Sequence, residues 1–216
     1  MNVYFISGLA ADERVFKYIL VPEGYKAVHI SWIKPIPSES LAEYALRLSE
    51  NIDHHQPFIL VGLSLGGMIA SEIAKIYTPE KIILISSVPE PAHMPAFYRI
   101  AGKIRLHKIV PVSAFKSASL LKQFFTPESE ADKIYLRQAI REGDPDFIRW
   151  AIHAIVTWKG NSSVDCTHIH GSDDHLLPVR YTRPTHLIKG GGHMMVLNRA
   201  DEINKILQEI FNPQDT

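Results

Sequence analysis

Short apolar runs alternate along the chain with segments in which apolar residues recur at helical spacing. This alternation is typical of a parallel β-sheet flanked by helices. The runs are hydrophobic almost throughout rather than at every second position, so we expect helices to cover both faces of the sheet. The sequence therefore predicts an α/β fold with six strands, at Val3 to Ser7, Ala27 to Ser31, Phe58 to Val61, Lys81 to Ile85, Val164 to His170 and Thr185 to Ile188.

Three helices between these strands have clear sequence signals. The first begins near Ser40, where the side chains of Ser40 and Glu43 can form a capping box. A second runs from about Leu65 to Tyr77. The last begins near Asn198, and its apolar residues fall on one face, which predicts that it docks against the sheet.

Residues 89–160 do not follow this alternation of strands and helices. This segment contains no convincing strand and is rich in aromatic and basic residues, which indicates a helical insertion. Thr126-Pro127 and Asp144-Pro145 each place a capping side chain before a proline at the first helical position, so we expect a helix to start at both. We therefore divide the chain into an α/β core of residues 1–88 and 161–216 and a helical lid insertion of residues 89–160.

The charge balance excludes several classes of partner. Among 216 residues, 23 Lys and Arg balance 23 Asp and Glu. The chain therefore has no excess of positive charge that would favour binding to nucleic acid or an anionic membrane. No apolar run approaches the ~20 residues that a membrane span needs. Because the single Cys166 cannot form an internal disulfide and the first residues lack a secretory signal pattern, we expect a cytoplasmic protein.

The segment Gly62 to Gly67 carries the clearest chemical motif, because it follows the third strand and opens the second helix. A serine in a tight strand-to-helix turn leaves little room for side chains two residues away on either side, and Gly62 and Gly66 occupy those positions. The turn would hold Ser64 at the C-terminal edge of the sheet, with the amide of Leu65 directed at an oxyanion. The alternative is a glycine-rich turn that only packs a helix against a strand.

A serine nucleophile needs a base, and the base needs an acid to orient it. His193 follows three glycines between the final strand and the final helix, which suits a loop that brings an imidazole close to another backbone. The other ten histidines are expected on the surface or in the core, and their spacing predicts no metal site. The acid is expected after the fifth strand, at Asp173 or Asp174, although either carboxylate could cap the next helix instead.

Together these motifs resemble those of the α/β-hydrolase superfamily, on its serine esterase and lipase branch, whose catalytic residues follow the same Ser, Asp, His order. The resemblance implies Ser64 as nucleophile and His193 as base. It selects Asp174 as the acid, because the family pattern Gly-x-x-Asp-x-x-x-Pro falls on Gly171, Asp174 and Pro178.

The resemblance also implies an oxyanion hole formed by the backbone amides of Leu65 and Leu9. Here the chain departs from the family, since Ser7-Gly8 stands where the family has His-Gly. Family members commonly carry two further strands before the first one here. Without them, the strand at residues 27–31 lies at one edge of the sheet and the strand at residues 185–188 at the other.

The implied activity is cleavage of a small, mostly apolar carboxylic ester, thioester or amide through an acyl-serine intermediate, with no metal or organic cofactor. Trp158, Phe125 and Met194 are the candidate residues for binding this small-molecule substrate. Two alternatives remain open. One is a ligand receptor without turnover, and the other is a lyase or carbon–carbon bond hydrolase that uses the same serine and histidine on a different bond.

Overall fold

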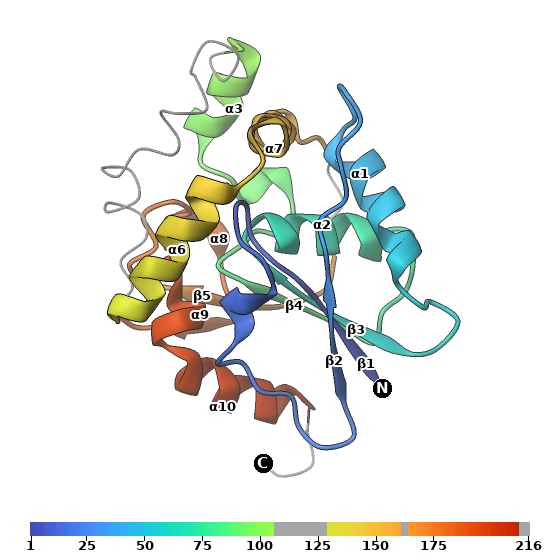
Figure 1. Ribbon diagram of the computed structural model, residues 1–216, viewed down its shortest axis with the longest axis vertical. Coiled ribbons are helices and arrows are strands. Elements are labelled where there is room, and N and C mark those ends of the chain that lie inside the picture. The colour runs from blue at the N-terminus through green and yellow to red at the C-terminus, as the bar shows by residue number, and fades with distance from the viewer. Residues whose placement is uncertain (106–128, 161–163, 212–216) are drawn as a thin grey trace.

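A six-stranded parallel β-sheet forms the centre of the molecule (Figure 1). The computed structural model describes residues 1–105, 129–160 and 164–211. The strands lie in the order β2-β1-β3-β4-β5-β6, so the predicted number of strands and both predicted edges are confirmed. Their bounds are β1 (Asn2–Ile6), β2 (Lys26–Ile30), β3 (Phe58–Leu63), β4 (Lys81–Ile85), β5 (Thr167–Gly171) and β6 (His186–Ile188).

Alternate residues of the strands face two separate hydrophobic clusters. Tyr4 and Ile6 of β1 pack in the cluster that includes α1 (Leu41–Leu48) and α2 (Leu65–Ala74). Val3 and Phe5 face the opposite cluster, which includes α9 (Met195–Asn198) and α10 (Ala200–Phe211). The described residues also form four short helices: η1 (Glu13–Phe16), η2 (Ser49–Asn51), η3 (Pro91–His93) and α8 (Val179–Thr182).

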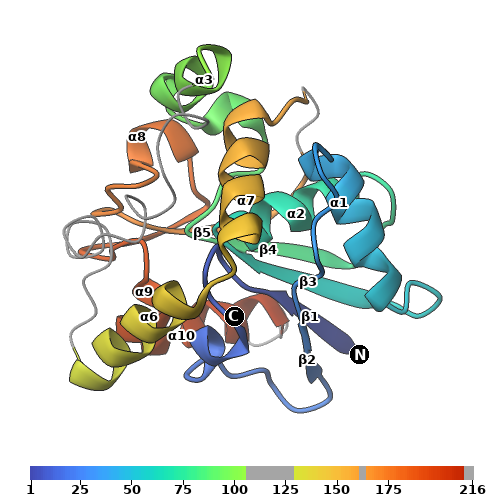
Figure 2. The ribbon, with the colours of Figure 1, turned by 45° about the horizontal axis from the view of Figure 1, so that its top comes forward.

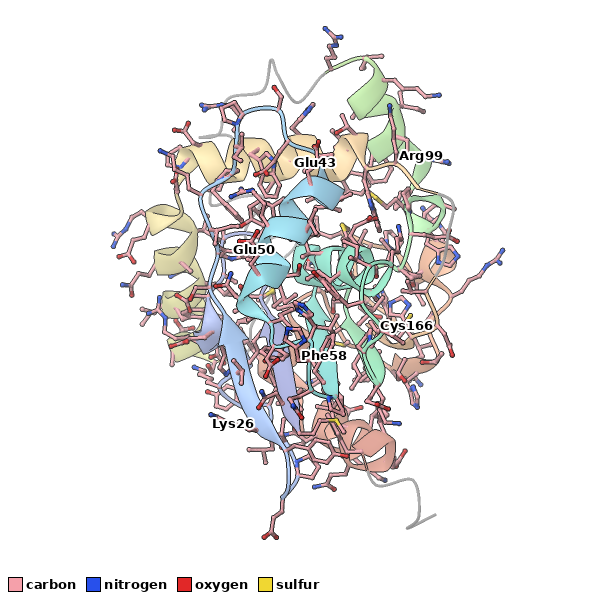
Figure 3. All side chains as sticks on the ribbon, turned by 90° about the vertical axis from the view of Figure 1, so that its right-hand side faces the viewer. Lys26, Glu43, Glu50, Phe58, Arg99 and Cys166 are labelled. Atoms are coloured by element: carbon pink, nitrogen blue, oxygen red, sulfur yellow. The ribbon has the colours of Figure 1, made fainter. Side chains whose placement is uncertain are left out.

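The expectation that helices cover the sheet holds for its central strands and fails at its edges. β3 is buried along its whole length. Edge strand β2 instead leaves most of its residues exposed, and Lys26 marks it in Figure 3. At the other edge Leu187 of β6 is 55% exposed. The two edge strands pair on one side only, which limits how much of each can be buried.

The predicted helix ends were partly wrong. The capping box is present, because Ser40 Oγ accepts from the Glu43 amide at 3.2 Å and Glu43 Oε2 accepts from the Ser40 amide at 2.7 Å. α2 ends at Ala74 rather than Tyr77, since the next amides turn back three residues, as at Lys75 N to Glu72 O. The final helical region begins earlier than predicted and breaks between α9 and α10.

The described part of the insertion is helical and contains α3 (Ala96–Lys103), α6 (Glu130–Glu142) and α7 (Pro145–Thr157). α7 lies on the side of α1 and α2, whereas α6 packs in the opposite cluster, near α9 (Figure 2). Asp144 caps α7 as predicted, accepting from two amides of its first turn. The predicted start at Thr126-Pro127 lies outside the described residues, and α6 begins at Glu130.

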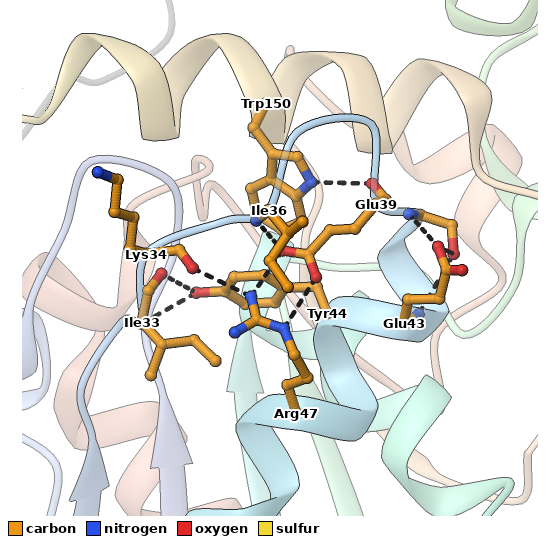
Figure 4. A network of polar contacts seen from close by, with 9 residues as sticks. Ile33, Lys34, Ile36, Glu39, Glu43, Tyr44, Arg47 and Trp150 are labelled. Atoms are coloured by element: carbon orange, nitrogen blue, oxygen red, sulfur yellow. Dashed lines mark hydrogen bonds and ion pairs between the residues drawn. The ribbon is translucent and has the colours of Figure 1, made fainter.

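Helix α7 is anchored to the core rather than held apart from it. Trp150 Nε1 donates to the backbone oxygen of Glu39 at 3.0 Å, and its ring centroid lies 4.1 Å from that of Tyr44 (Figure 4). The Glu39 carboxylate accepts from Arg47 at 2.7 Å, so a partly buried polar network supports this contact. α7 and the sheet therefore share one hydrophobic cluster.

Candidate active site

Ser64 lies in the turn between β3 and α2, with φ 52° and ψ −117°. A non-glycine residue rarely has a positive φ, and this one costs about 1–3 kcal/mol that the surroundings must offset. The glycines make the turn possible. A Cβ on Gly62 would lie 2.4 Å from Gly67 Cα, and a Cβ on Gly66 would lie 2.1 Å from the Ile6 oxygen. The crowding predicted for Gly62 and Gly66 is therefore a contact between backbones.

Three predicted side chains meet in one hydrogen-bonded row. His193 Nε2 lies 2.9 Å from Ser64 Oγ, and His193 Nδ1 lies 2.8 Å from Asp174 Oδ2. Because an ionised carboxylate only accepts hydrogen bonds, we assign the imidazole proton to Nδ1. Nε2 can then accept the serine proton. The residues come from the ends of three different segments, which the parallel sheet brings to one edge.

Asp174 is held rigidly and is nearly inaccessible, with 2% of its surface exposed. Its Oδ1 accepts from the amides of Leu176 at 2.9 Å and Leu177 at 2.8 Å, while Oδ2 faces His193. Burial acts to raise the pKa of the Asp174 carboxyl. The interactions of the carboxylate with His193, together with those of His170 and the Leu177 amide, outweigh burial and hold that pKa below its usual range.

The neighbouring Asp173 points elsewhere. It is exposed, its Oδ1 accepts from Ser172 Oγ at 2.6 Å, and its amide donates to the Gly191 oxygen at 2.9 Å. It provides no cap for α8, the helix that follows. The structure therefore places Asp174, and not Asp173, beside His193, and the Asp173 side chain bonds within its own loop.

Glycines bring the two supporting loops together. A Cβ on Gly171, at the end of β5, would lie 2.0 Å from the Gly191 oxygen in the loop before His193. Gly190 has φ +74°, a conformation that side chains disfavour. The glycine run before His193 therefore has the predicted effect of allowing close approach of another backbone.

Two buried histidines of β5 lie behind the acid, a contact that sequence reasoning missed. His170 Nε2 donates to the Leu177 oxygen at 2.7 Å and lies 3.4 Å from Asp174 Oδ2. His168 Nε2 lies 3.2 Å from His170 Nδ1. Burial lowers the pKa of His170, and burial lowers the pKa of His168 to about 3. The spacing of two histidines on one face of a strand was the available signal.

The predicted oxyanion donors flank Ser64. Leu65 begins α2 directly after the serine, and Leu9 lines the cavity beside it. A Cβ on Gly8 would lie 3.4 Å from Ser64 Cβ, so the turn that carries Leu9 rests against the serine.

An apolar cavity of about 350 Å³ opens at Ser64 and His193. Among the described residues, its walls carry no Asp, Glu, Lys or Arg. One side comes from the turn after β1, and the other from side chains of α6 and α7. The wall residues from the two insertion helices are Leu136, Ile140, Ile148, Ile152, Ile155 and Val156.

The predicted substrate-binding residues had different outcomes. Met194 lines the cavity, whereas Phe125 lies outside the described residues. Trp158 does not line the cavity: it is 7% exposed, packs in the core and donates from Nε1 to Glu72 Oε1 at 2.6 Å. Trp158 immediately follows α7, and its indole is drawn inward by the buried Glu72 carboxylate. The isoleucines of α7, which the sequence showed as an apolar stripe, form the wall instead.

Within residues 1–105, 129–160 and 164–211, no helix is both long and apolar enough to cross a bilayer. The same ranges contain no cluster of three His, Cys, Asp or Glu side chains placed to hold a metal ion.

A sequence model of the alpha/beta hydrolase family matches residues 3–206, which is most of the chain. The protein belongs to the alpha/beta hydrolase family. No curated protein shows a sequence match to it.

Several solved structures share its fold. A thermophilic esterase from Thermogutta terrifontis is similar over 100% of this chain and 91% of its own, with TM-score 0.68 and 16% identity. A hydrolase from Pseudomonas aeruginosa PA01 is similar over 97% and 89%, with TM-score 0.72 and 12% identity. A thioesterase from the prodiginine biosynthetic pathway in Streptomyces coelicolor is similar over 97% and 90%, with TM-score 0.68 and 12% identity.

Proposed function

We propose that this protein is a serine hydrolase that cleaves small, mostly apolar carboxylic esters or thioesters. The observation that carries the proposal is the row Ser64, His193, Asp174 at the mouth of an apolar cavity. Family membership and the fold shared with an esterase and a thioesterase support the same chemistry.

In the proposed mechanism, the Ser64 oxygen attacks the substrate carbonyl while its proton moves to His193 Nε2. Asp174 stabilises the imidazolium and fixes the ring orientation. The amides of Leu65 and Leu9 bind the oxyanion of the tetrahedral intermediate. His193 then protonates the leaving alcohol or thiol, and a water molecule repeats the sequence on the acyl-serine to release the acid.

The cavity favours a neutral acyl group. An ionised substrate group inside it would lose its hydration without meeting an opposite charge, because the described part of the wall carries none. The volume of about 350 Å³ is at the small end of the range for ligand pockets, which favours compact acyl groups.

A fluorophosphonate probe followed by a panel of aryl esters of graded acyl length tests the proposal. We expect the wild-type protein to be labelled and to hydrolyse short, neutral esters, and Ser64→Ala to lose both properties. Ser71→Ala is the matched control, because Ser71 lies on the same helix but donates its hydroxyl to the Gly67 oxygen at 3.0 Å. Labelling of the Ser64→Ala protein would exclude Ser64 as nucleophile. Labelling without turnover of any ester would favour a receptor.

A further inference from the structure

Two side-chain donors converge on a single carbonyl oxygen near Ser64. The Ser7 hydroxyl, one residue after β1, donates to the Ala11 oxygen at 2.9 Å. The Trp32 indole, two residues after β2, donates from Nε1 to the same oxygen at 3.0 Å. A carbonyl oxygen has two lone pairs, so these donors satisfy it fully.

This oxygen belongs to Ala11, the last residue of the tight turn that runs from Gly8 to Ala11. The Ala11 amide donates to the Gly8 oxygen at 3.1 Å, and Ala10 has φ 56°, which is uncommon for alanine. Such a backbone conformation persists only where the surroundings hold it. The turn also carries Leu9 and lies against Ser64, so any change in its position moves the Leu9 amide relative to the serine.

The two donors are themselves well fixed. Ser7 is 4% exposed. The Trp32 ring packs against the ring of Phe147 on α7, with a centroid distance of 5.0 Å, and against Tyr44 on α1 at 6.3 Å. The Ala11 carbonyl is therefore tied both to the sheet and to the helices above it.

We propose that Ser7 and Trp32 are positioning residues for the oxyanion hole, which act by holding the Ala11 carbonyl and thereby the Leu9 amide. This inference rests on the proposed function. It also accounts for the departure from the family pattern, because the serine that stands in place of histidine has a structural partner of its own.

The expected kinetic effect follows from when the oxyanion exists. A displaced Leu9 amide weakens binding of the tetrahedral intermediate and leaves ground-state binding nearly unchanged, so kcat falls while KM stays within about two-fold. Ser7→Ala and Trp32→Phe each leave one donor in place, and each should lower kcat by about 3- to 10-fold. The double variant should lose at least ~10²-fold, because loss of one oxyanion donor typically costs 10²–10³.

Matched controls are available in the same chain. Ser49 is also buried and donates to the Leu46 oxygen at 2.6 Å, and Trp158 Nε1 donates to Glu72 Oε1 at 2.6 Å, away from the cavity. Ser49→Ala and Trp158→Phe remove side-chain hydrogen bonds without touching the turn. They should lower thermal stability and leave kcat within about two-fold.

The experiment measures kcat and KM on a neutral aryl ester, the inhibition constant of an alkyl trifluoromethyl ketone, and deuterium exchange in a peptide covering the turn. We expect the Ser7 and Trp32 variants to exchange faster in that peptide and to bind the ketone more weakly in proportion to kcat. Unchanged exchange and kcat in the double variant would overturn the proposal. Faster exchange with unchanged kcat would overturn the positioning role.

Failure of the proposed function gives a different result. If the wild-type protein hydrolyses no ester and is not labelled by a fluorophosphonate, the catalytic role falls with the proposed function. The exchange measurement still decides whether the two donors hold the turn.

Discussion

At the scale of single residues, the site depends on the separate environments of two adjacent carboxylates. Asp174 has both oxygens occupied, by two amides on one side and by His193 on the other. Asp173 is exposed and bonds within its own loop. A buried carboxylate beside His193 and a carboxylate on the surface are therefore direct neighbours in the sequence.

Asp174→Asn is expected to lower turnover by at least ~10²-fold. An amide NH₂ facing His193 would favour the imidazole tautomer that is protonated at Nε2, which cannot accept the Ser64 proton; in a serine protease the same change costs ~10⁴. Asp173→Asn should stay within about two-fold of wild type. Measuring kcat and the melting temperature of both variants tests this, and a slow D173N enzyme beside an active D174N enzyme would contradict the assignment.

Trp158→Phe is expected to change stability rather than selectivity. The variant keeps the aromatic ring but removes the donor to the buried Glu72 carboxylate, which should cost about 1–3 kcal/mol of unfolding free energy. The ratio of rates on short and long acyl esters should stay at its wild-type value, because Trp158 does not line the cavity. Urea unfolding and the ester panel measure the two effects. A changed ratio of rates on short and long acyl esters would show that Trp158 contributes to substrate selectivity.

At the scale of elements, β5 carries an unusual interior for an inner strand. His168 and His170 are 2% and 0% exposed, and both face the same side of the sheet. His170 donates to Leu177, so its Nδ1 accepts the proton of His168 Nε2. This arrangement holds two neutral imidazoles in defined tautomers: a second proton on His170 Nδ1 would face the donor of His168, and a second proton on His168 would charge a buried ring.

The folded protein should therefore become less stable as the pH falls. The unfolded chain binds protons at both histidines as the pH falls below about 6.5, whereas burial holds the folded pKa of His168 near about 3. Between these values the unfolded state binds more protons at His168, so the free energy of unfolding falls with pH by up to about 1.4 kcal/mol per pH unit. The lowered pKa of His170 acts in the same direction.

Comparison of wild type with His168→Gln measures this contribution. The glutamine amide can still donate to His170 but does not titrate. Urea unfolding at pH 7 and pH 5 should show a smaller loss of stability in the variant than in wild type. An equal loss in both proteins would place the acid sensitivity elsewhere.

At the scale of the whole molecule, the cavity exists because the insertion helices lie over the edge of the sheet that carries Ser64. The turn after β1 forms one wall, and α6 and α7 form the other. α7 also packs into the same hydrophobic cluster as the sheet, so the cavity wall and the core are continuous. Side chains such as Met68, Tyr98 and Leu176 complete the lining, so α6 and α7 limit the cavity on one side.

Ile152→Phe is expected to shift preference toward shorter acyl groups by about 10-fold, since a larger side chain occupies volume that a longer chain would fill. Ile134→Phe is the control, because Ile134 on α6 is 61% exposed. The ratio of kcat/KM for short and long aryl esters measures the effect. If both variants keep the wild-type ratio, Ile152 does not limit the acyl group.

Much of this protein is determined by its sequence alone, because the relevant signals are local. The strands of the sheet, the capping box at Ser40 and the turn at Ser64 depend on residues within a few positions of each other. Local backbone sterics explain Gly62, where a Cβ would lie 2.4 Å from Gly67 Cα, whereas Gly66 is required by a contact with Ile6 of β1. The glycine run before His193 is visible in the sequence, but the backbone that it approaches belongs to Gly171 of β5.

Tertiary structure decided which residues act together. The α7 stripe is visible in the sequence, but only the orientation of the helix over the sheet sends Phe147 to the core and Ile152 to the cavity. Trp158 and Trp32 are the same residue type, but Trp158 donates to the Glu72 carboxylate in the core, whereas Trp32 donates to the Ala11 oxygen in the turn beside Ser64. Such roles depend on contacts between residues far apart in the chain, and sequence spacing carries no information about the distance between them.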